Sequence, residues 1–127
     1  MGPLNILIAT PEAVPYAKTG GLADVAGAVP KAVASRGHAV KLILPLYPHV
    51  DHDKHKLQRI ASGLRARIAG RDEVFHVQKC EADGSEVWFI EHDGFFSRPE
   101  LYRDPSTGGD WADNDERFGF FARAVLE

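Results

Sequence analysis

Two short apolar runs, at 4–10 and 39–47, flank a helical pattern, and this order limits the possible folds more than any other feature. Between the runs, apolar residues recur at helical spacing: Leu22, Val25, Ala26, Val29 and Val33. A glycine stop follows at Gly37. Strand, helix and strand within about 45 residues predict a βαβ unit with a right-handed crossover, and therefore a parallel sheet.

The first run, LNILIAT, is nearly continuous, which is typical of a central parallel strand covered on both faces. Pro30 lies inside the helical segment, where proline removes a backbone hydrogen bond and crowds the carbonyl of Ala26. We therefore expect a kink at this point of the helix rather than its end.

The middle of the chain has the pattern of an antiparallel ribbon. EVFHVQKC (73–80) and EVWFIEH (86–92) flank EADGS, in which Asp83-Gly84 is a strong signal for a two-residue hairpin turn. LRARIAG (64–70) alternates well enough to form a third strand. The predicted fold class is therefore α/β: a Rossmann-like parallel sheet with helices and an antiparallel hairpin excursion.

The last third combines a long loop with a helix. Residues 93–114 are rich in Pro, Gly, Ser and Asp with interspersed aromatic residues, which predicts a long ordered loop, and such loops often carry function. Residues 113–127 begin with a capping Asp or Asn and carry apolar residues at helical spacing: Phe118, Phe121, Ala122 and Val125. Because no stop signal follows, we expect the domain formed by 1–127 to be incomplete at its C-terminal end.

Composition excludes several classes of protein. A length of 127 residues suits one domain, and a net charge of -3 provides no basic surface for nucleic acid. The N-terminal run is too short for a signal segment or a membrane span, so we expect no membrane partner and a cytoplasmic protein. Cys80 is the only cysteine and is expected to be an inert thiol. PHVDHDKH (48–55) carries metal-ligating residue types, but its pattern favours a solvated loop over a metal site.

The stretch PYAKTGGLADVAG (15–27) carries the strongest chemical signal. It places Lys18, Gly20 and Gly21 at the start of a helix, where unpaired N–H groups and the helix dipole attract anions. The two glycines let a ligand approach the backbone closely. However, the spacing matches neither G-x-G-x-x-G nor G-x-x-x-x-G-K-[ST], so the residues alone leave two readings open: a phosphate site and a plain structural turn.

The same stretch resembles the start of bacterial glycogen synthases and plant starch synthases, whose signature is K-x-G-G-L-A-D-V. The resemblance includes ILIATPEAVPYA (6–17), VWFIEHDGFFSRPELY (87–102) and the D-N-x-x-R-F pattern at 113–118. It implies the N-terminal part of a two-domain GT-B enzyme that needs no metal or other cofactor. Such enzymes transfer glucose from ADP-glucose to the non-reducing end of an α-1,4-glucan such as glycogen, with retention.

The resemblance also implies roles for particular residues. Lys18, Gly20 and Gly21 would face the phosphates and the glucose of the donor. Asp24 would bond a sugar hydroxyl, with a favourable interaction with the helix dipole as the equal alternative. Asn114 would approach the cleft or serve as a helix cap. No catalytic residue is assigned within the chain, because the later family motifs lie beyond Glu127.

Two functions remain open at this point. One is the donor-side part of a retaining glucosyltransferase, and the other is a non-catalytic module that binds a nucleotide sugar or a glucan. We expect the chain alone to have no synthase activity. We also expect the runs at 4–10 and 39–47 to expose an unpaired sheet edge, and the final helix to leave Phe118, Phe121 and Val125 poorly packed. We therefore expect the isolated chain to self-associate through these surfaces, or to be ordered only as part of a longer polypeptide.

Overall fold

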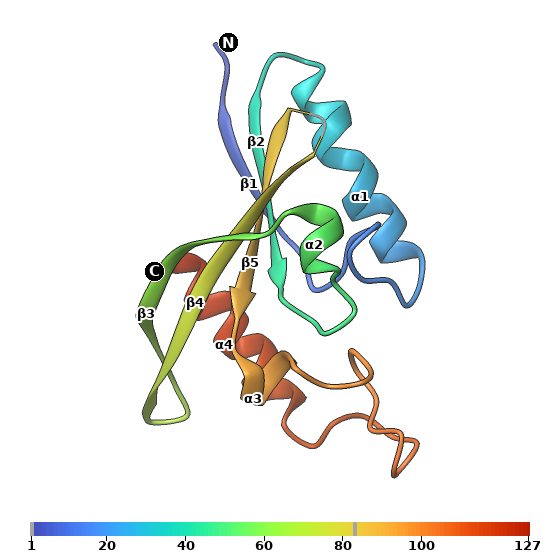
Figure 1. Ribbon diagram of the computed structural model, residues 1–127, viewed down its shortest axis with the longest axis vertical. Coiled ribbons are helices and arrows are strands. Elements are labelled where there is room, and N and C mark those ends of the chain that lie inside the picture. The colour runs from blue at the N-terminus through green and yellow to red at the C-terminus, as the bar shows by residue number, and fades with distance from the viewer. Residues whose placement is uncertain (1, 83) are drawn as a thin grey trace.

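The computed structural model describes residues 2–82 and 84–127, which form a mixed five-stranded sheet flanked by helices (Figure 1). In chain order the elements are β1 (Asn5–Ala9), α1 (Gly21–Ala34), β2 (Ala39–Pro45), α2 (His52–His55), β3 (Gln58–Ile68), β4 (Arg71–Ala82), β5 (Ser85–Glu91), α3 (Asp93–Phe96) and α4 (Asn114–Leu126). The strand order across the sheet is β1-β2-β5-β4-β3.

The sheet is parallel on one side and antiparallel on the other. β1 pairs in parallel with β2, and β2 pairs in parallel with β5, whereas β4 pairs antiparallel with both β5 and β3. The predicted βαβ unit and three-stranded ribbon are thus confirmed. Asp83 of the predicted hairpin turn lies outside the described residues, but the pairing of Ala82 with Ser85 shows the hairpin register.

Side chains of β2 alternate between two cores because successive residues of a strand point to opposite faces. Leu42 and Leu44 pack with Ala26 of α1, whereas Ile43 packs with Phe120 of α4. Figure 1 shows α4 passing behind the ribbon of β3, β4 and β5, while α1 runs alongside β2 and β5. Both faces of the sheet are therefore covered by a helix.

The expected unpaired edge is confirmed for β1 but not for β2. β1 is an edge strand of the described sheet, although its apolar run had suggested a central strand, and Leu7 in it is 48% exposed. β2 is not an edge, because β5 pairs with it in parallel as well as belonging to the ribbon. The final helix is packed: Phe121 is buried, and Phe118 contacts the rings of Phe96 and Tyr102. Self-association through the remaining β1 edge stays a prediction.

The segment 48–55 contains a short helix that the sequence did not suggest. Asp51 caps α2 by accepting from the N–H groups of Asp53 and Lys54, and the cap holds the pKa of Asp51 below its usual value. Within 2–82 and 84–127, no three His, Cys, Asp or Glu residues are grouped as a metal site would require. In the same residues, no helix combines the length and apolar character needed to cross a membrane.

Helix α1 continues through Pro30 and lies close to the segment that follows β1. The contact depends on Gly27: a Cβ there would lie 2.5 Å from Val14 Cγ2 and 2.8 Å from the Val14 carbonyl oxygen. The N–H of Val14 donates to the carbonyl of Ala23 at 3.0 Å, so the segment cannot move away freely. The absent side chain at position 27 is what lets the loop after β1 dock on α1.

We expect Gly27→Ala to destabilise the fold although alanine favours helices. The gain in helix propensity is about 1 kcal/mol, whereas forcing a methyl group against fixed backbone costs about 1–3 kcal/mol. Gly119→Ala in α4 is the matched control, because its Cβ would meet only the end of Ile68, at 3.3 Å. Thermal unfolding should show a lower midpoint for Gly27→Ala alone, and an equal or raised midpoint would contradict the close contact.

Candidate functional site

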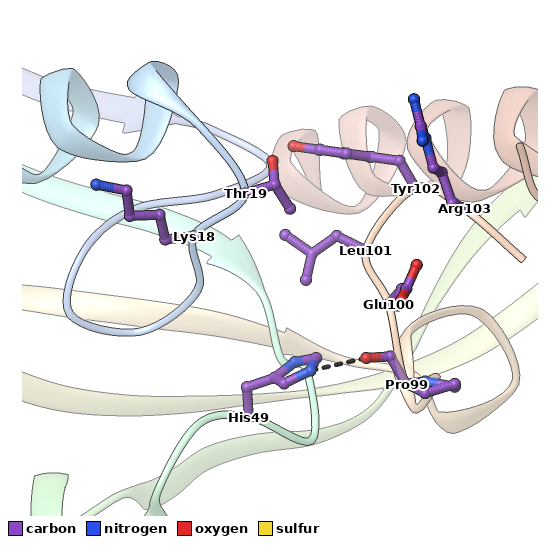
Figure 2. Close-up of a pocket in the computed structure, with 8 residues that line it drawn as sticks. All are labelled: Lys18, Thr19, His49, Pro99, Glu100, Leu101, Tyr102 and Arg103. Carbon is purple, nitrogen blue, oxygen red and sulfur yellow. Dashed lines mark hydrogen bonds between the residues drawn. The ribbon is translucent and has the colours of Figure 1, made fainter. Parts of the chain in front are cut away.

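The loops that follow the three parallel strands meet at one end of the sheet and enclose a cavity. Its volume is about 490 Å³, and its lining residues are Lys18, Thr19, His49, Pro99, Glu100, Leu101, Tyr102 and Arg103. Figure 2 shows Lys18 and Thr19 on one side of the cavity and the segment 99–103 on the other. Ligands of α/β sheets bind beyond the carboxyl ends of parallel strands, so this cavity is the candidate site.

Glu12 is a buried acid that lies between these two walls. Its side chain sits just beyond the end of β1, and the residue is 1% exposed. Its carboxylate accepts four hydrogen bonds, from Thr19 Oγ1 (2.6 Å), the Tyr102 hydroxyl (2.7 Å), and the N–H groups of Gly20 and Ala23 (3.2 Å each). The four donors come from both walls of the cavity.

These hydrogen bonds set the protonation states of Glu12 and Tyr102. Burial alone would raise the pKa of Glu12, but the hydrogen bonds from Thr19, Tyr102 and Gly20 outweigh burial and hold it below its usual value. Burial, together with the Glu12 carboxylate, raises the pKa of the Tyr102 hydroxyl. At neutral pH Glu12 is therefore ionised and Tyr102 carries the proton that it donates.

Glu12 also occupies part of the helix N-terminus to which we assigned a phosphate. Gly20 is the N-cap of α1 and has no side chain to cap it, so the Glu12 carboxylate fills that role. Of the described residues, none accepts from the N–H groups of Gly21 and Leu22. A Cβ at Gly20 or Gly21 would meet nothing within 4 Å, so the turn is open on its outer side. Phosphate binding at these glycines stays a prediction.

Lys18 and Asp24 form an exposed ion pair beside this turn. Lys18 Nζ lies 2.8 Å from each carboxylate oxygen of Asp24, and both side chains are about half exposed, at 51% and 56%. Figure 2 shows the ammonium group turned away from Leu101 and Tyr102. Exposed pairs of this kind contribute about 1 kcal/mol or less, so an anionic ligand can replace Asp24 as the partner of Lys18.

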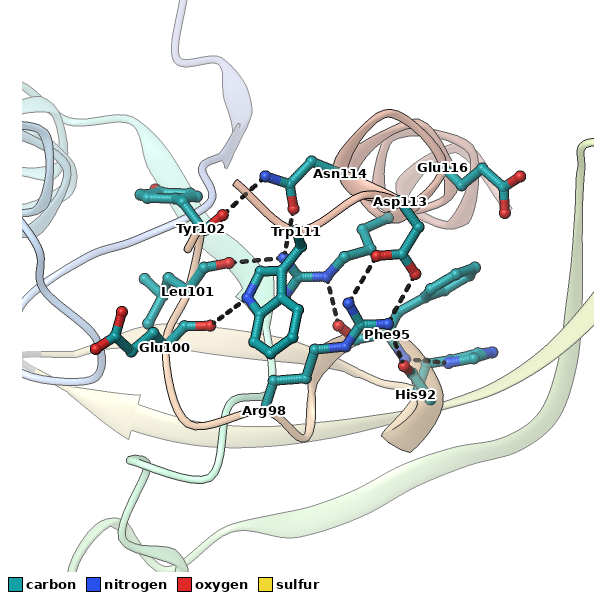
Figure 3. Close-up of polar contacts among 12 residues, drawn as sticks. His92, Phe95, Arg98, Glu100, Leu101, Tyr102, Trp111, Asp113, Asn114 and Glu116 are labelled. Atoms are coloured by element: carbon teal, nitrogen blue, oxygen red, sulfur yellow. Dashed lines mark hydrogen bonds and ion pairs between the residues drawn. The ribbon is translucent and has the colours of Figure 1, made fainter. Parts of the chain in front are cut away.

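Asn114 lies at the start of α4, but its side chain neither caps the helix nor faces open space. Its Nδ2 donates to the carbonyl of Tyr102 at 2.9 Å, and its Oδ1 accepts from Arg117 at 2.8 Å (Figure 3). The N-cap is Asp113, whose carboxylate is bound to Arg98. The alternative of Asn114 as the helix cap was wrong, because the N-cap position falls on Asp113 and the Oδ1 that a capping Asn114 would use accepts from Arg117 instead.

Contacts of Arg98 and Trp111 hold the segment before α4 in place. Arg98 binds both carboxylate oxygens of Asp113, at 2.6 and 2.7 Å, and its guanidinium lies 4.8 Å from the centre of the Trp111 ring. Trp111 Nε1 donates to the carbonyl of Glu100 at 2.9 Å (Figure 3). Trp111 is half-buried and ties the cavity wall to the loop behind it.

Arg117 anchors this wall from inside the protein. It is fully buried and donates to the carbonyls of Phe95 (2.6 Å) and Leu101 (2.7 Å). Burial lowers the pKa of its guanidinium, and its Nη2 has no hydrogen-bond partner among the described residues. The cation is thus used to bind loop carbonyls, which fixes the backbone that carries Tyr102.

Comparison with known proteins identifies the family. The model of the starch synthase catalytic domain matches residues 5–127. Glycogen synthase 1 of Geobacter sulfurreducens is 40% identical over 98% of this chain, and the glycogen synthase of Anaeromyxobacter sp. (strain Fw109-5) is 42% identical over 97%. This chain belongs to the starch synthase catalytic domain family. It spans about a quarter of the length of these relatives, 25% and 24% respectively.

A solved structure of the family shows the same fold. The catalytic domain of Starch Synthase IV from Arabidopsis thaliana, bound to ADP and acarbose, superposes with a TM-score of 0.84 at 30% identity. The match covers 98% of this chain and 25% of that one. The α/β fold class and the predicted resemblance to glycogen and starch synthases are therefore confirmed, and the described residues have the fold of the matching quarter of a starch synthase catalytic domain of the GT-B class.

Three residues of this candidate site escaped the sequence analysis: Glu12, Tyr102 and Arg117. Glu12 follows the first strand at the position where ligands of α/β sheets bind, which is a usable signal. Arg117 falls among the apolar positions of the last helix, where a charged residue needs a partner. Tyr102 gives no local signal, because its contact with Glu12 joins residues 90 positions apart.

The lowered pKa of Glu12 predicts a loss of stability in acid. A carboxylate whose folded pKa lies below its unfolded pKa stabilises the fold fully above the unfolded value, and this contribution disappears as pH falls through the folded value. We expect the free energy of unfolding of the unsubstituted protein to exceed that of Glu12→Gln most at pH 7. The difference should shrink at pH values well below the usual 4.5 of a glutamate. A difference that stays constant down to pH 3 would contradict an ionised Glu12.

Proposed function

We propose that this chain forms the N-terminal part of a glycogen or starch synthase. The enzyme would transfer glucose from ADP-glucose to the non-reducing end of an α-1,4-glucan, with retention at the anomeric carbon. The observation that carries this proposal is the structural match to a starch synthase catalytic domain bound to ADP and acarbose. Residues 1–127 would be an incomplete N-terminal Rossmann-like domain of that enzyme.

Lys18 is the residue of this chain best suited to contact the donor. It lies on the turn between β1 and α1 and lines the cavity, and within 2–82 and 84–127 its ammonium group bonds only to the exposed carboxylate of Asp24. A diphosphate would draw the ammonium group away from Asp24, and the charge would then stabilise the nucleoside diphosphate as it leaves. Once released, the carboxylate of Asp24 could accept a hydrogen bond from a sugar hydroxyl.

The glycines would act beside Lys18 in a different way. The N–H groups of Gly21 and Leu22 point out of the first turn of α1 and have no acceptor among the described residues. They would donate to a donor phosphate or sugar oxygen, while Glu12 holds the other N–H groups of the turn. Asn114 would act through the loop backbone, since both polar atoms of its side chain are already bound.

Glucosyl transfer by a polypeptide that contains this chain and the rest of the family's catalytic unit tests the proposal. We expect transfer from ADP-glucose to glycogen, and a fall in kcat/KM of about 100-fold or more in Lys18→Gln, the usual cost of losing one charge-stabilising donor. Lys31→Gln is the matched control, because Lys31 is exposed in the last turn of the same helix. If the unsubstituted protein binds ADP-glucose or glycogen without transferring glucose, the alternative of a non-catalytic module is favoured. Equal rates for Lys18→Gln and Lys31→Gln would show that Lys18 is not part of the site.

Replacing either glycine tests whether the ligand approaches the turn. We expect Gly20→Val and Gly21→Val to leave the thermal midpoint nearly unchanged, because a Cβ at either position meets nothing within 4 Å. The affinity for ADP-glucose should fall about tenfold or more, because the side chain would fill the space of the ligand. Gly109→Val, in the loop before α4, provides a control whose Cβ contacts only Thr107 Oγ1, at 3.9 Å. Normal donor affinity in both turn variants would show that the ligand lies elsewhere.

A further inference from the structure

Glu12 contacts both walls of the cavity without lining it. One wall is the turn that carries Thr19 and Gly20, and the other is the segment 99–103. The two walls are far apart in sequence, and the carboxylate between them accepts from Thr19, Gly20 and Ala23 on one side and from Tyr102 on the other. The hydroxyl of Tyr102 is thus the link by which Glu12 holds the second wall.

The second wall is also fixed from behind. Asn114 Nδ2 and the N–H of Trp111 both donate to the carbonyl of Tyr102, at 2.9 and 3.0 Å. Arg117 donates to the neighbouring carbonyl of Leu101 at 2.7 Å. These contacts set the backbone position of Tyr102, so its hydroxyl can reach Glu12 without reordering the loop.

We propose that Glu12 is a positioning residue that couples the glycine turn to the segment 99–103 through Tyr102 and so keeps the cavity in its binding shape. This inference rests on the proposed function, because the coupled walls are those that would receive the donor and the glucan. Glu12 itself would not touch the substrate: it is 1% exposed, and its carboxylate already accepts four hydrogen bonds.

The magnitude of the effect follows from the chemistry of the carboxylate. Hydrogen bonds to a buried charged group stabilise a structure more than an exposed ion pair such as Lys18 and Asp24 does. A displacement of about 1 Å in a substrate-positioning group can cost about 100-fold in rate. Loss of the Tyr102 link should therefore reduce catalysis more than it reduces stability.

Tyr102→Phe removes only the link, and Tyr47→Phe is its matched control. Tyr47 is buried whereas Tyr102 is half-buried, and Tyr47 also donates its hydroxyl to an oxygen of the segment after β1, the carbonyl of Pro11, at 2.7 Å. In the polypeptide with the complete catalytic unit, we expect similar thermal midpoints for the two variants. We expect kcat/KM for ADP-glucose to fall at least tenfold in Tyr102→Phe, and to change less than twofold in Tyr47→Phe. Equal kinetic effects of the two variants would overturn the proposal.

A double-mutant cycle separates coupling from direct contact of each wall with substrate. Thr19→Val removes the donor from the opposite wall. If both hydroxyls act through Glu12, the loss of kcat/KM in the double variant should be clearly smaller than the product of the two single losses.

Glu12→Gln should retain more activity than Glu12→Ala, because an amide can still accept from the N–H groups and donate to both hydroxyls. Losses that multiply, or equal activity of the two Glu12 variants, would contradict the coupling.

Amide hydrogen exchange tests the coupling without any catalytic activity. In Tyr102→Phe, exchange should become faster both in 99–103 and in the first turn of α1, whereas in Tyr47→Phe neither segment should change. If the unsubstituted protein transfers no glucose but this exchange pattern is observed, the proposed function fails and the coupling stands. If the unsubstituted protein transfers glucose but the exchange pattern is absent, the proposed function stands and the coupling fails.

Discussion

The buried carboxylate of Glu12 is the interaction on which the functional end of the sheet depends. A carboxylate with 1% exposure is stable only if it receives hydrogen bonds that replace its water, and four donors from two segments of the chain, 19–23 and 99–103, meet that need. The carboxylate needs these donors, and by bonding to it the loops that carry the donors are held close to one another. Loops that follow different strands therefore acquire a common, fixed geometry.

Arg117 supports the same region by the opposite chemistry. A buried cation normally pairs with a carboxylate, but Arg117 donates to the carbonyls of Phe95 and Leu101 and to the side chain of Asn114. Removing it would leave loop carbonyls unpaired inside the protein, which costs about 1–3 kcal/mol for each group. The loop before α4 is long and poor in regular structure, so these carbonyl contacts replace the hydrogen bonds that a strand or helix would provide.

Sequence patterns predicted the parts of this structure that depend on local periodicity. The βαβ unit, the hairpin and the last helix follow from apolar spacing and turn residues within a few positions of one another. The pairing of β5 with β2 was missed, because a strand can belong to a ribbon and to a parallel sheet at once. The bond between Glu12 and Tyr102 could not be predicted either, since its partners are 90 positions apart and neither has a local pattern that indicates the other.

The turn between β1 and α1 combines a fixed inner layer with an exchangeable outer layer. The inner layer is the charged set of hydrogen bonds to Glu12, which is shielded from water and holds the N–H groups of Gly20 and Ala23. The outer layer is the exposed pair of Lys18 and Asp24, which competes with solvent and contributes about 1 kcal/mol or less. A phosphate cannot easily replace Glu12, because the carboxylate is enclosed by protein donors. It can replace Asp24 at little cost, and the free energy of binding would then be spent on ligand contacts rather than on rearranging the turn.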